Sequence, residues 1–258
     1  MYDTLATVYD WILPDALLSP EGAAAAFASV ADELPPGARV LDCAAGTGQL
    51  AVGLALRGFA VTATDASAGM IERTRALAAE HGAAVRALRC AWEELGGQGW
   101  EDDFHAVLCV GNSLTHAPGR AGRRAALAAM AGVLRPSGLL AVTSRNWELV
   151  RAARRGLDVA DRLRERDGRS GLVIRAWTFP DEWESPHWLD VAVALPGPDG
   201  AVETRGEALA FWPFTHEELD ADLRHAGLEP AASTYAPDAE RYLVTARRGA
   251  DRGGGASP

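Results

Sequence analysis

An aspartate followed by closely spaced glycines has the residue types and spacing to hold a nucleotide. Val40 and Leu41 form a short apolar run that predicts a buried parallel strand, and Asp42 stands at its carboxyl end. Small residues fill almost every position up to Gly48, and residues 49–58 then predict a helix. Glycine and alanine let a ligand approach the backbone closely, and the start of a helix offers free N–H groups. The stretch therefore predicts a nucleotide-binding corner between a strand and a helix.

The glycine spacing separates two kinds of nucleotide site. A dinucleotide fingerprint needs Gly-x-Gly-x-x-Gly, whereas the glycines here are at 46, 48 and 53. The pattern acid-x-small-x-Gly-x-Gly is met in full by Asp42, Ala44, Gly46 and Gly48. In this the stretch resembles motif I of the class I S-adenosylmethionine-dependent methyltransferases, in which glycine is usual at the place of Ala44. The resemblance implies an α/β, Rossmann-like seven-stranded sheet and S-adenosylmethionine as cofactor, with S-adenosylhomocysteine as its product; a plain packed turn is the alternative.

A second carboxylate strengthens the nucleotide interpretation. Asp65 ends the next predicted strand, and a carboxylate there can accept both ribose hydroxyls, with a helix N-cap as its alternative role. Trp92 offers a stacking surface for adenine and Met70 could cover one adenine face, although each suits a core position equally well. The resemblance implies further cofactor contacts at the ends of the strands, at Ala66, Ala91, Val110 and Gly111.

The segment from Gly111 to His116 reads Gly-Asn-Ser-Leu-Thr-His and follows the fourth predicted strand at its carboxyl edge. Ligands bind at that edge in open α/β sheets. The segment resembles the corresponding part of glycine N-methyltransferase and the bacterial glycine/sarcosine methyltransferases, which also carry alanine at the place of Ala44. We expect Asn112 to make a polar contact with cofactor or substrate; a capped turn and a structural His116 are the alternatives.

Arg145 and Trp147 stand at the end of the fifth predicted strand, where the glycine methyltransferases carry Arg-Asn-Tyr. The resemblance implies that Arg145 binds a substrate carboxylate, with Trp147 beside the substrate. A guanidinium suits that task because it has two parallel donors and a fixed charge. An arginine paired with a neighbouring acid is the alternative.

The N-terminal segment carries aromatic residues, Tyr9 and Trp11 among them, ahead of the first predicted strand. Small-molecule methyltransferases often open with a similar Tyr-Asp-x-x-Ala-x-x-Tyr-Asp segment that acts as a lid over the cofactor. Tyr9 would then offer its hydroxyl to the methionine carboxylate or to the substrate; an amphipathic helix with both rings on the core is the alternative. An amine acceptor must lose a proton, and His116, Tyr9 or water is expected to take it.

Strands and helices that position these residues alternate up to residue 149, and the alternation then breaks. Residues 151–169 are charged and predict a solvated helix, whereas three apolar runs after them predict antiparallel strands that roof the site. Four tryptophans gather there and suit the core better than a pocket wall: Trp177, Trp183, Trp188 and Trp212. The expected divisions are an N-terminal lid with helices (1–34), a cofactor-binding core (35–149), a substrate-covering insertion (150–212), a C-terminal helix and hairpin (213–248) and a disordered tail (249–258).

Composition excludes several classes of function. The net charge of −10 argues against a nucleic-acid partner, and the sequence contains no lysine, which excludes a P-loop or a pyridoxal Schiff base. No apolar run of about 18 residues or signal peptide is present, and the three cysteines form no CxxC, so we expect a cytoplasmic protein without a membrane partner. No metal-ligand cluster is apparent and no metal is expected, whereas a homo-oligomer remains open.

The expected reaction is methyl transfer from S-adenosylmethionine to a small-molecule acceptor, first of all the nitrogen of a carboxylate-bearing amine. An O- or C-methyltransferase of specialised metabolism, acting on an aromatic molecule under the tryptophan-rich roof, is the second hypothesis. A protein that binds S-adenosylmethionine without catalysis is the third. An NAD oxidoreductase is a fourth, which the glycine spacing disfavours.

Overall fold

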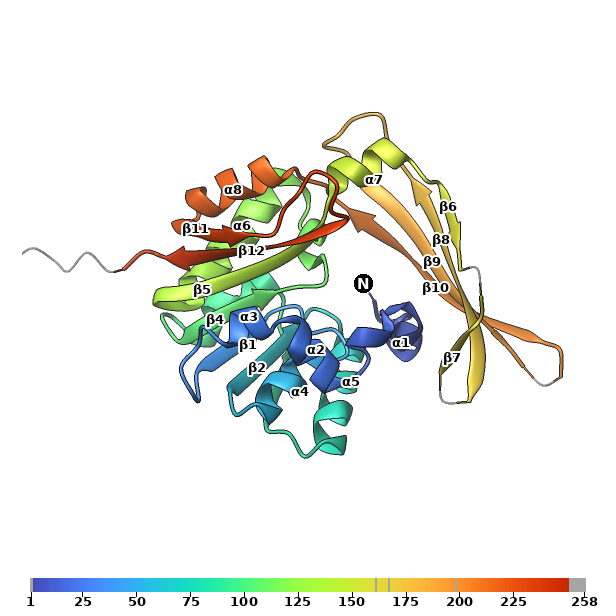
Figure 1. Ribbon diagram of the computed structural model, residues 1–258, viewed down its shortest axis with the longest axis horizontal. Coiled ribbons are helices and arrows are strands. Elements are labelled where there is room, and N and C mark those ends of the chain that lie inside the picture. Colours follow the sequence, from blue (N-terminus) through green and yellow to red (C-terminus); the bar gives the residue numbers. More distant parts are fainter. Residues whose placement is uncertain (1, 161, 167, 198, 251–258) are drawn as a thin grey trace, which may run out of the picture.

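The computed structural model describes residues 2–160, 162–166, 168–197 and 199–250, and two β-sheets organise them (Figure 1). The larger sheet, here the core sheet, has seven strands in the order β11-β12-β5-β4-β1-β2-β3. Its strands are β1 (Arg39–Asp42), β2 (Ala60–Asp65), β3 (Val85–Arg89), β4 (Phe104–Cys109), β5 (Leu134–Arg145), β11 (Leu228–Ser233) and β12 (Arg241–Arg248). Strands β1 to β5 pair in parallel, and β12 runs antiparallel to β5 and β11. This is the expected Rossmann-like seven-stranded sheet, and the fold prediction is confirmed.

Helices cover both faces of the core sheet (Figure 1). One face packs against helices α2, α3 and α4, and the other packs against α6 and α8. The bounds of the elements in and around these layers are α2 (Pro20–Ala26), α3 (Ala28–Ala31), α4 (Gln49–Leu56), α5 (Ala68–Glu80), η3 (Trp92–Gln98), η4 (Ser113–His116), α6 (Gly119–Val133) and α8 (His216–His225). Burial on both faces explains why β1 and β4 read as continuous apolar runs rather than alternating ones.

A second, antiparallel sheet, here the roof sheet, stands apart from the core sheet in Figure 1. Its order is β10-β9-β8-β6, and β7 also pairs with β8. The strands are β6 (Leu157–Val159), β7 (Arg164–Arg166), β8 (Arg169–Thr178), β9 (His187–Pro196) and β10 (Val202–Phe211), and α7 (Trp147–Ala153) leads into them. Buried and more open residues alternate along β9, as expected for a sheet with one covered face. The antiparallel insertion predicted from the sequence is therefore present.

The N-terminal segment lies between the core sheet and the roof sheet (Figure 1). It forms η1 (Ala6–Val8), α1 (Tyr9–Ile12) and η2 (Asp15–Leu17). Leu5, Val8 and Trp11 join the apolar cluster on the inner face of the roof sheet. The contact with the roof is close, because a Cβ added at Gly171 of β8 would lie 2.5 Å from a ring carbon of Trp11.

The prediction of a helix over residues 151–169 is wrong. Helix α7 ends at Ala153, and the chain continues through β6 and β7. The guanidinium of Arg164 donates to the carbonyls of Trp11 and Leu13, at 2.8 Å each, and Arg166 Nε donates to the carbonyl of Asp10 at 3.2 Å. These tertiary contacts hold the segment extended, whereas a count of charged residues indicates only a solvated surface.

Two smaller expectations also need correction or qualification. Within residues 1–34, where helices are expected, the helical stretch after Pro20 is divided at Phe27 into α2 and α3. The expected glycine-rich tail lies outside the described residues from 251 onward. Among the described residues, every helix is too short or too polar to cross a membrane.

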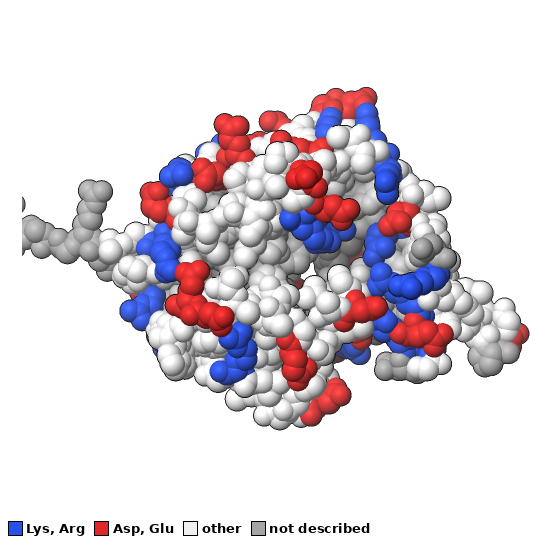
Figure 2. Space-filling view, viewed as in Figure 1, with Lys and Arg blue, Asp and Glu red and all other residues white. Residues whose placement is uncertain are grey.

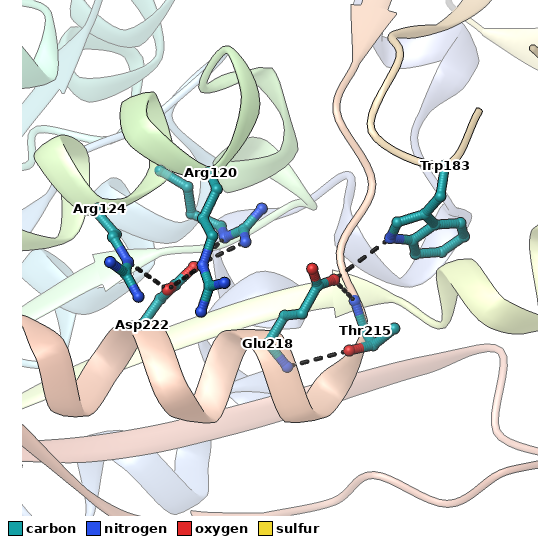
Figure 3. A network of polar contacts seen from close by, with 7 residues as sticks. Arg120, Arg124, Trp183, Thr215, Glu218 and Asp222 are labelled. Atoms are coloured by element: carbon teal, nitrogen blue, oxygen red, sulfur yellow. Dashed lines mark hydrogen bonds and ion pairs between the residues drawn. The ribbon is translucent and has the colours of Figure 1, made fainter.

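A polar network attaches α8 to α6 and to the roof (Figure 3). Asp222 of α8 is buried and pairs with Arg120, Arg123 and Arg124 of α6, at 3.0, 2.7 and 2.6 Å. Burial raises the pKa of Asp222, but the three arginine hydrogen bonds outweigh it and leave that pKa lowered. Near the helix start, Glu218 and Thr215 form a capping box.

Candidate active site

The glycine corner joins β1 to α4 at the carboxyl edge of the core sheet. Gly46 and Gly48 have positive φ angles of 55° and 94°, a region that L side chains rarely adopt. A Cβ at Gly48 would lie 2.8 Å from the side chain of Thr74, so α5 packs directly on the corner. Thr74 Oγ1 also donates to the carbonyl of Gly46 at 2.9 Å. The corner is therefore a tight backbone turn that α5 supports through Thr74.

Asp65 lies beside this corner at the end of β2. Its two carboxylate oxygens accept from the N–H groups of Gly46 and Ser67, at 3.0 and 2.9 Å. Burial raises its pKa. Ser67, rather than Asp65, is the N-cap of α5, because its hydroxyl accepts from the N–H of Met70. A carboxylate has about four lone-pair positions, so Asp65 keeps acceptor capacity for ribose hydroxyls.

A cavity of about 220 Å³ lies next to Asp65. Several residues expected around a nucleoside line it: Ala44, Asp65, Ala66, Ala91 and Trp92. The Trp92 indole donates to the carbonyl of Cys43 at 2.8 Å, which fixes the ring in the wall. Met70 is 2% exposed and does not belong to this lining, so its side chain packs in the core instead of covering the cavity.

A second cavity, of about 380 Å³, begins on the other side of Ala44 and reaches the ends of β4, β5 and β12. Tyr9, Asp42, Gly46, Val110 and Gly111 line it together with residues of the N-terminal segment and α2. The two cavities share Ala44 and Ser113 in their walls. The structure thus gathers most of the cofactor residues predicted from the sequence around two adjoining spaces.

Asp42 is a buried acid in the second cavity. Its exposed fraction is 1%, and its closest hydrogen bond is from the N–H of Ala44, at 3.4 Å. Burial raises its pKa to about 7. Within the described part of the chain no cationic side chain pairs with it. A ligand with an ammonium group would stabilise the carboxylate, and this is the kind of group that the amino-acid part of S-adenosylmethionine carries.

Tyr2 and His116 form a pair under the roof that the sequence did not predict as a unit. The Tyr2 hydroxyl lies 2.8 Å from His116 Nε2, and His116 Nδ1 lies 2.8 Å from the carbonyl of Ala210 in β10. A carbonyl can only accept, so Nδ1 carries the hydrogen and Nε2 accepts the Tyr2 proton. Both residues line the smaller cavity. The repeated Tyr-Asp of the N-terminal segment was the only sequence signal that pointed to Tyr2.

The two expected proton acceptors have pKa values unsuited to strong bases. Burial lowers the pKa of His116 to about 4, so its ring is neutral and weakly basic near pH 7. Burial raises the pKa of Tyr9 to about 12, so its hydroxyl stays protonated. His116 is therefore a fixed hydrogen-bond acceptor, and Tyr9 remains a neutral hydroxyl at the larger cavity.

Asn112 and Trp147 are buried and are not among the residues that line the two cavities. Asn112 is 4% exposed, and its Oδ1 accepts from the backbone N–H of Arg145 at 2.9 Å. This bond ties the end of β4 to the end of β5, and Asn112 makes no side-chain cap. Trp147 is 1% exposed and packs on Trp177 and Phe211. Neither Asn112 nor Trp147 lines the two cavities, so the structure does not bring these two predicted contacts to a ligand surface.

Arg145 stands at the last position of β5, partly exposed. Within the described part of the chain its guanidinium has no hydrogen bond or ion pair. The alternative role, an arginine paired with a neighbouring acid, is therefore not what the structure shows. Among the described residues there is also no group of three His, Cys, Asp or Glu side chains that could hold a metal ion.

Comparison with known proteins gives this arrangement a context. Residues 40–138 match the family model described as a methyltransferase domain. Over 112 residues the chain is 34% identical to the glycine/sarcosine N-methyltransferase of Aphanothece halophytica, covering 43% of this chain and 42% of that enzyme. It is 35% identical over 124 residues to the glycine N-methyltransferase of Rattus norvegicus, again covering 43% and 42%. The chain thus spans less than half the length of the curated relatives it matches.

Solved structures match over a longer stretch at lower identity. A S-adenosylmethionine-dependent methyltransferase from Clostridium acetobutylicum superposes with a TM-score of 0.75 and 16% identity, covering 96% of this chain and 99% of that one. At that identity the likeness shows the fold alone. The glycine corner, the seven-stranded order and the family match nevertheless agree. Residues 40–138 thus match a methyltransferase domain, and they lie within a fold that is like that of solved S-adenosylmethionine-dependent methyltransferases.

Proposed function

We propose that this protein transfers a methyl group from S-adenosylmethionine to the nitrogen of a small amine that carries a carboxylate. One observation carries the choice of acceptor: the guanidinium of Arg145, at the end of β5, has no ion-pair or hydrogen-bond partner among the described residues. Partial burial of a cation without a counter-ion costs free energy, and a bound carboxylate would offset that cost. The relatives named for glycine and sarcosine support the same class of acceptor.

In this proposal one cofactor molecule occupies both cavities. Asp65 accepts the ribose hydroxyls, and Ala66, Ala91 and Trp92 surround adenine in the smaller cavity. In the larger cavity Asp42 faces the ammonium group, and the backbone at Ala44, Gly46, Gly48, Val110 and Gly111 lies along the amino-acid part. Tyr9 closes this space from the N-terminal segment. Bound S-adenosylmethionine supplies a methyl group already activated on a sulfonium.

The task left to the protein is orientation. The acceptor nitrogen must lie about 3 Å behind the methyl carbon and in line with it, and such placement can supply roughly 7–11 kcal/mol. Arg145 would fix one end of the acceptor. Because the Tyr2 hydroxyl donates its proton to His116, its oxygen can only accept, and it would hold an N–H of the acceptor. With His116 only weakly basic, we expect the amine to bind in its neutral form or to lose its proton to water.

A methyl-transfer screen tests this proposal. The protein is incubated with S-adenosylmethionine and amino acids, amines without a carboxylate, phenols or carbon acids, and S-adenosylhomocysteine release is measured. We expect turnover with the first group. The Arg145→Leu variant should then raise KM at least tenfold, whereas Arg247→Leu, which changes a surface arginine paired with Glu33, should not. An unchanged KM in Arg145→Leu would reject the anchor.

The other two hypotheses receive less support from the geometry. The four roof tryptophans do not line either cavity, so the tryptophan-rich wall on which the aromatic-acceptor hypothesis depended is not found there. Turnover with phenols alone would reverse this preference. A protein without catalysis would bind S-adenosylmethionine tightly and give no turnover with any acceptor in the screen.

A further inference from the structure

Two arginines face each other at the edge of the larger cavity. In the antiparallel pair of β5 and β12, Arg145 is the direct partner of Arg241. Side chains of directly opposite residues lie on the same face, with Cβ atoms about 4.5–5.5 Å apart, and like charges at such positions are destabilising. The register therefore brings two positive charges together at a place where the fold alone gains nothing from them.

The same face of these two strands lines the cavity. Thr143 lies two residues before Arg145, and Leu243 lies two residues after Arg241, so each shares a face with its arginine. Thr143 and Leu243 are also register partners, and both belong to the cavity wall. Arg241 belongs to it too and is exposed there. Arg145 is not itself in that wall; it lies beside Arg241, two residues beyond Thr143 on the same face of the sheet. Figure 2 shows arginine side chains on both sides of a hollow between the core half and the roof half.

Neither guanidinium is neutralised. Within the described residues, Arg145 and Arg241 form no ion pair and donate no side-chain hydrogen bond. The contrast is the cluster of three arginines on α6, which surrounds the carboxylate of Asp222 (Figure 3). Of these two arginine clusters, the one on α6 has a counter-ion within the described part of the chain and the pair of Arg145 and Arg241 does not.

Two other charged residues, Arg175 and Glu240, lie near Arg145 and Arg241. Arg175 of the roof strand β8 adds a third positive charge and is itself 3.6 Å from Asp158. Glu240 is the acid that acts on both arginines, and it is exposed. Burial, followed by repulsion from Arg241 and Arg175, lowers the pKa of Arg145 to about 10. Burial also lowers the pKa of Arg241.

We infer that Arg145 and Arg241 together bind the acceptor, through a group that carries two negative charges. The inference rests on the proposed function, because it shares Arg145 with it. Two neighbouring guanidinium groups offer two forks of parallel donors and a charge of +2, which one carboxylate satisfies only in part. A phosphate ester or a pair of carboxylates supplies the matching charge and enough oxygen atoms. The acceptor is then an amine bearing such a dianion.

Calorimetry on the S-adenosylhomocysteine-loaded protein tests the inference without turnover. The probes are inorganic phosphate, succinate and acetate. We expect phosphate or succinate to bind at least tenfold more tightly than acetate, and the better of the two identifies the source of the charges. Arg241→Gln and Arg145→Gln should each weaken that probe at least tenfold. Arg247→Gln is the matched control on the same strand, because its side chain pairs with Glu33.

Three results would overturn the inference. Acetate binding as tightly as phosphate and succinate would show that one charge is enough. An unchanged affinity in Arg241→Gln, with a loss in Arg145→Gln, would leave a single-arginine anchor and the proposed function intact. A tenfold weaker affinity for S-adenosylhomocysteine in Arg241→Gln, at an unchanged melting temperature, would assign Arg241 to the cofactor carboxylate. The Arg241→Lys variant keeps the charge without the fork and should recover only part of the probe affinity.

Discussion

The core sheet and the roof sheet differ in how the chain builds the part of the candidate site beside each of them. The glycine corner of the core comes from seven consecutive residues, 42–48, with Asp65 one strand away. The surface under the roof is assembled from distant parts of the chain: Tyr2, His116, Arg145 and Arg241. Residues 40–138, which match the methyltransferase domain, include the corner and none of the roof strands. The glycine corner is thus a local segment inside the matched domain, whereas the proposed acceptor surface brings together residues that only folding makes neighbours.

The largest expected effect is a loss of stability when a buried ion pair in the core half is broken. Asp222→Ala leaves Arg123, whose side chain is 3% exposed, without its counter-ion. Loss of one partner from a buried ion pair typically costs about 3–5 kcal/mol. We expect a decrease of that order in the free energy of unfolding, measured by urea denaturation. Asp220→Ala, on the exposed face of α8, removes a pair worth only about 0.5 kcal/mol or less. Equal losses in both variants would contradict the core role of Asp222.

Two buried groups, His116 and Asp42, should make the free energy of unfolding depend on pH with opposite sign. Burial lowers the folded-state pKa of His116 to about 4, so its stability contribution is complete above about pH 6.5 and is lost as the pH falls toward 4. Burial raises the folded-state pKa of Asp42 to about 7, so its contribution is complete below about pH 4 and is lost as the pH rises toward 7.

Two variants separate these contributions. Relative to wild type, Asp42→Asn should gain stability from pH 5 to pH 8, on the order of 2–4 kcal/mol, because the folded state no longer has to bury a charge. His116→Gln should flatten the loss of stability on the acid side. Urea denaturation at pH 5, 6, 7 and 8 measures both. A pH dependence shared by wild type and both variants would refute the assignment.

Cofactor affinity should depend on the core alone. Asp65→Ala removes the proposed acceptor for two ribose hydroxyls, and each hydrogen bond to a charged group contributes about 1.5–3 kcal/mol. We expect the affinity for S-adenosylhomocysteine to fall about 100-fold in calorimetry. Asp103→Ala is the control, since Asp103 pairs with Arg39 at the opposite edge of the sheet. An affinity within threefold of wild type in Asp65→Ala would mean that the ribose binds elsewhere.

The smallest effect concerns the link between the N-terminal segment and the roof. Tyr2→Phe leaves the buried Nε2 of His116 without a donor, at a cost of about 1–2 kcal/mol in unfolding free energy. Tyr235→Phe removes a hydroxyl bonded to Glu148 on the surface and should cost less than about 0.5 kcal/mol. Thermal or urea unfolding compares the two variants. A greater loss in Tyr235→Phe would show that the Tyr2–His116 pair does not hold the segment.

The sequence predicted the core better than the roof because core signals are local. The apolar runs and the glycine corner each occupy a few consecutive residues, and the structure contains both. The roof strands were also predicted, but residues 151–169 were assigned to a helix because their charges suggested a solvated surface. The carbonyl groups that hold Arg164 extended come from the N-terminal segment, about 150 residues away.

Sequence alone determined the class I fold, the nucleotide-binding corner and the position of Arg145 at a strand end, because strand periodicity and turn chemistry depend on neighbouring residues. Only the tertiary structure decided which side chains meet around the acceptor space. It placed Met70 and Trp147 in the core, brought Tyr2 to His116 and set Arg241 opposite Arg145. The physical reason is that strand register and the packing of distant segments determine these contacts, and a single sequence does not state either of them.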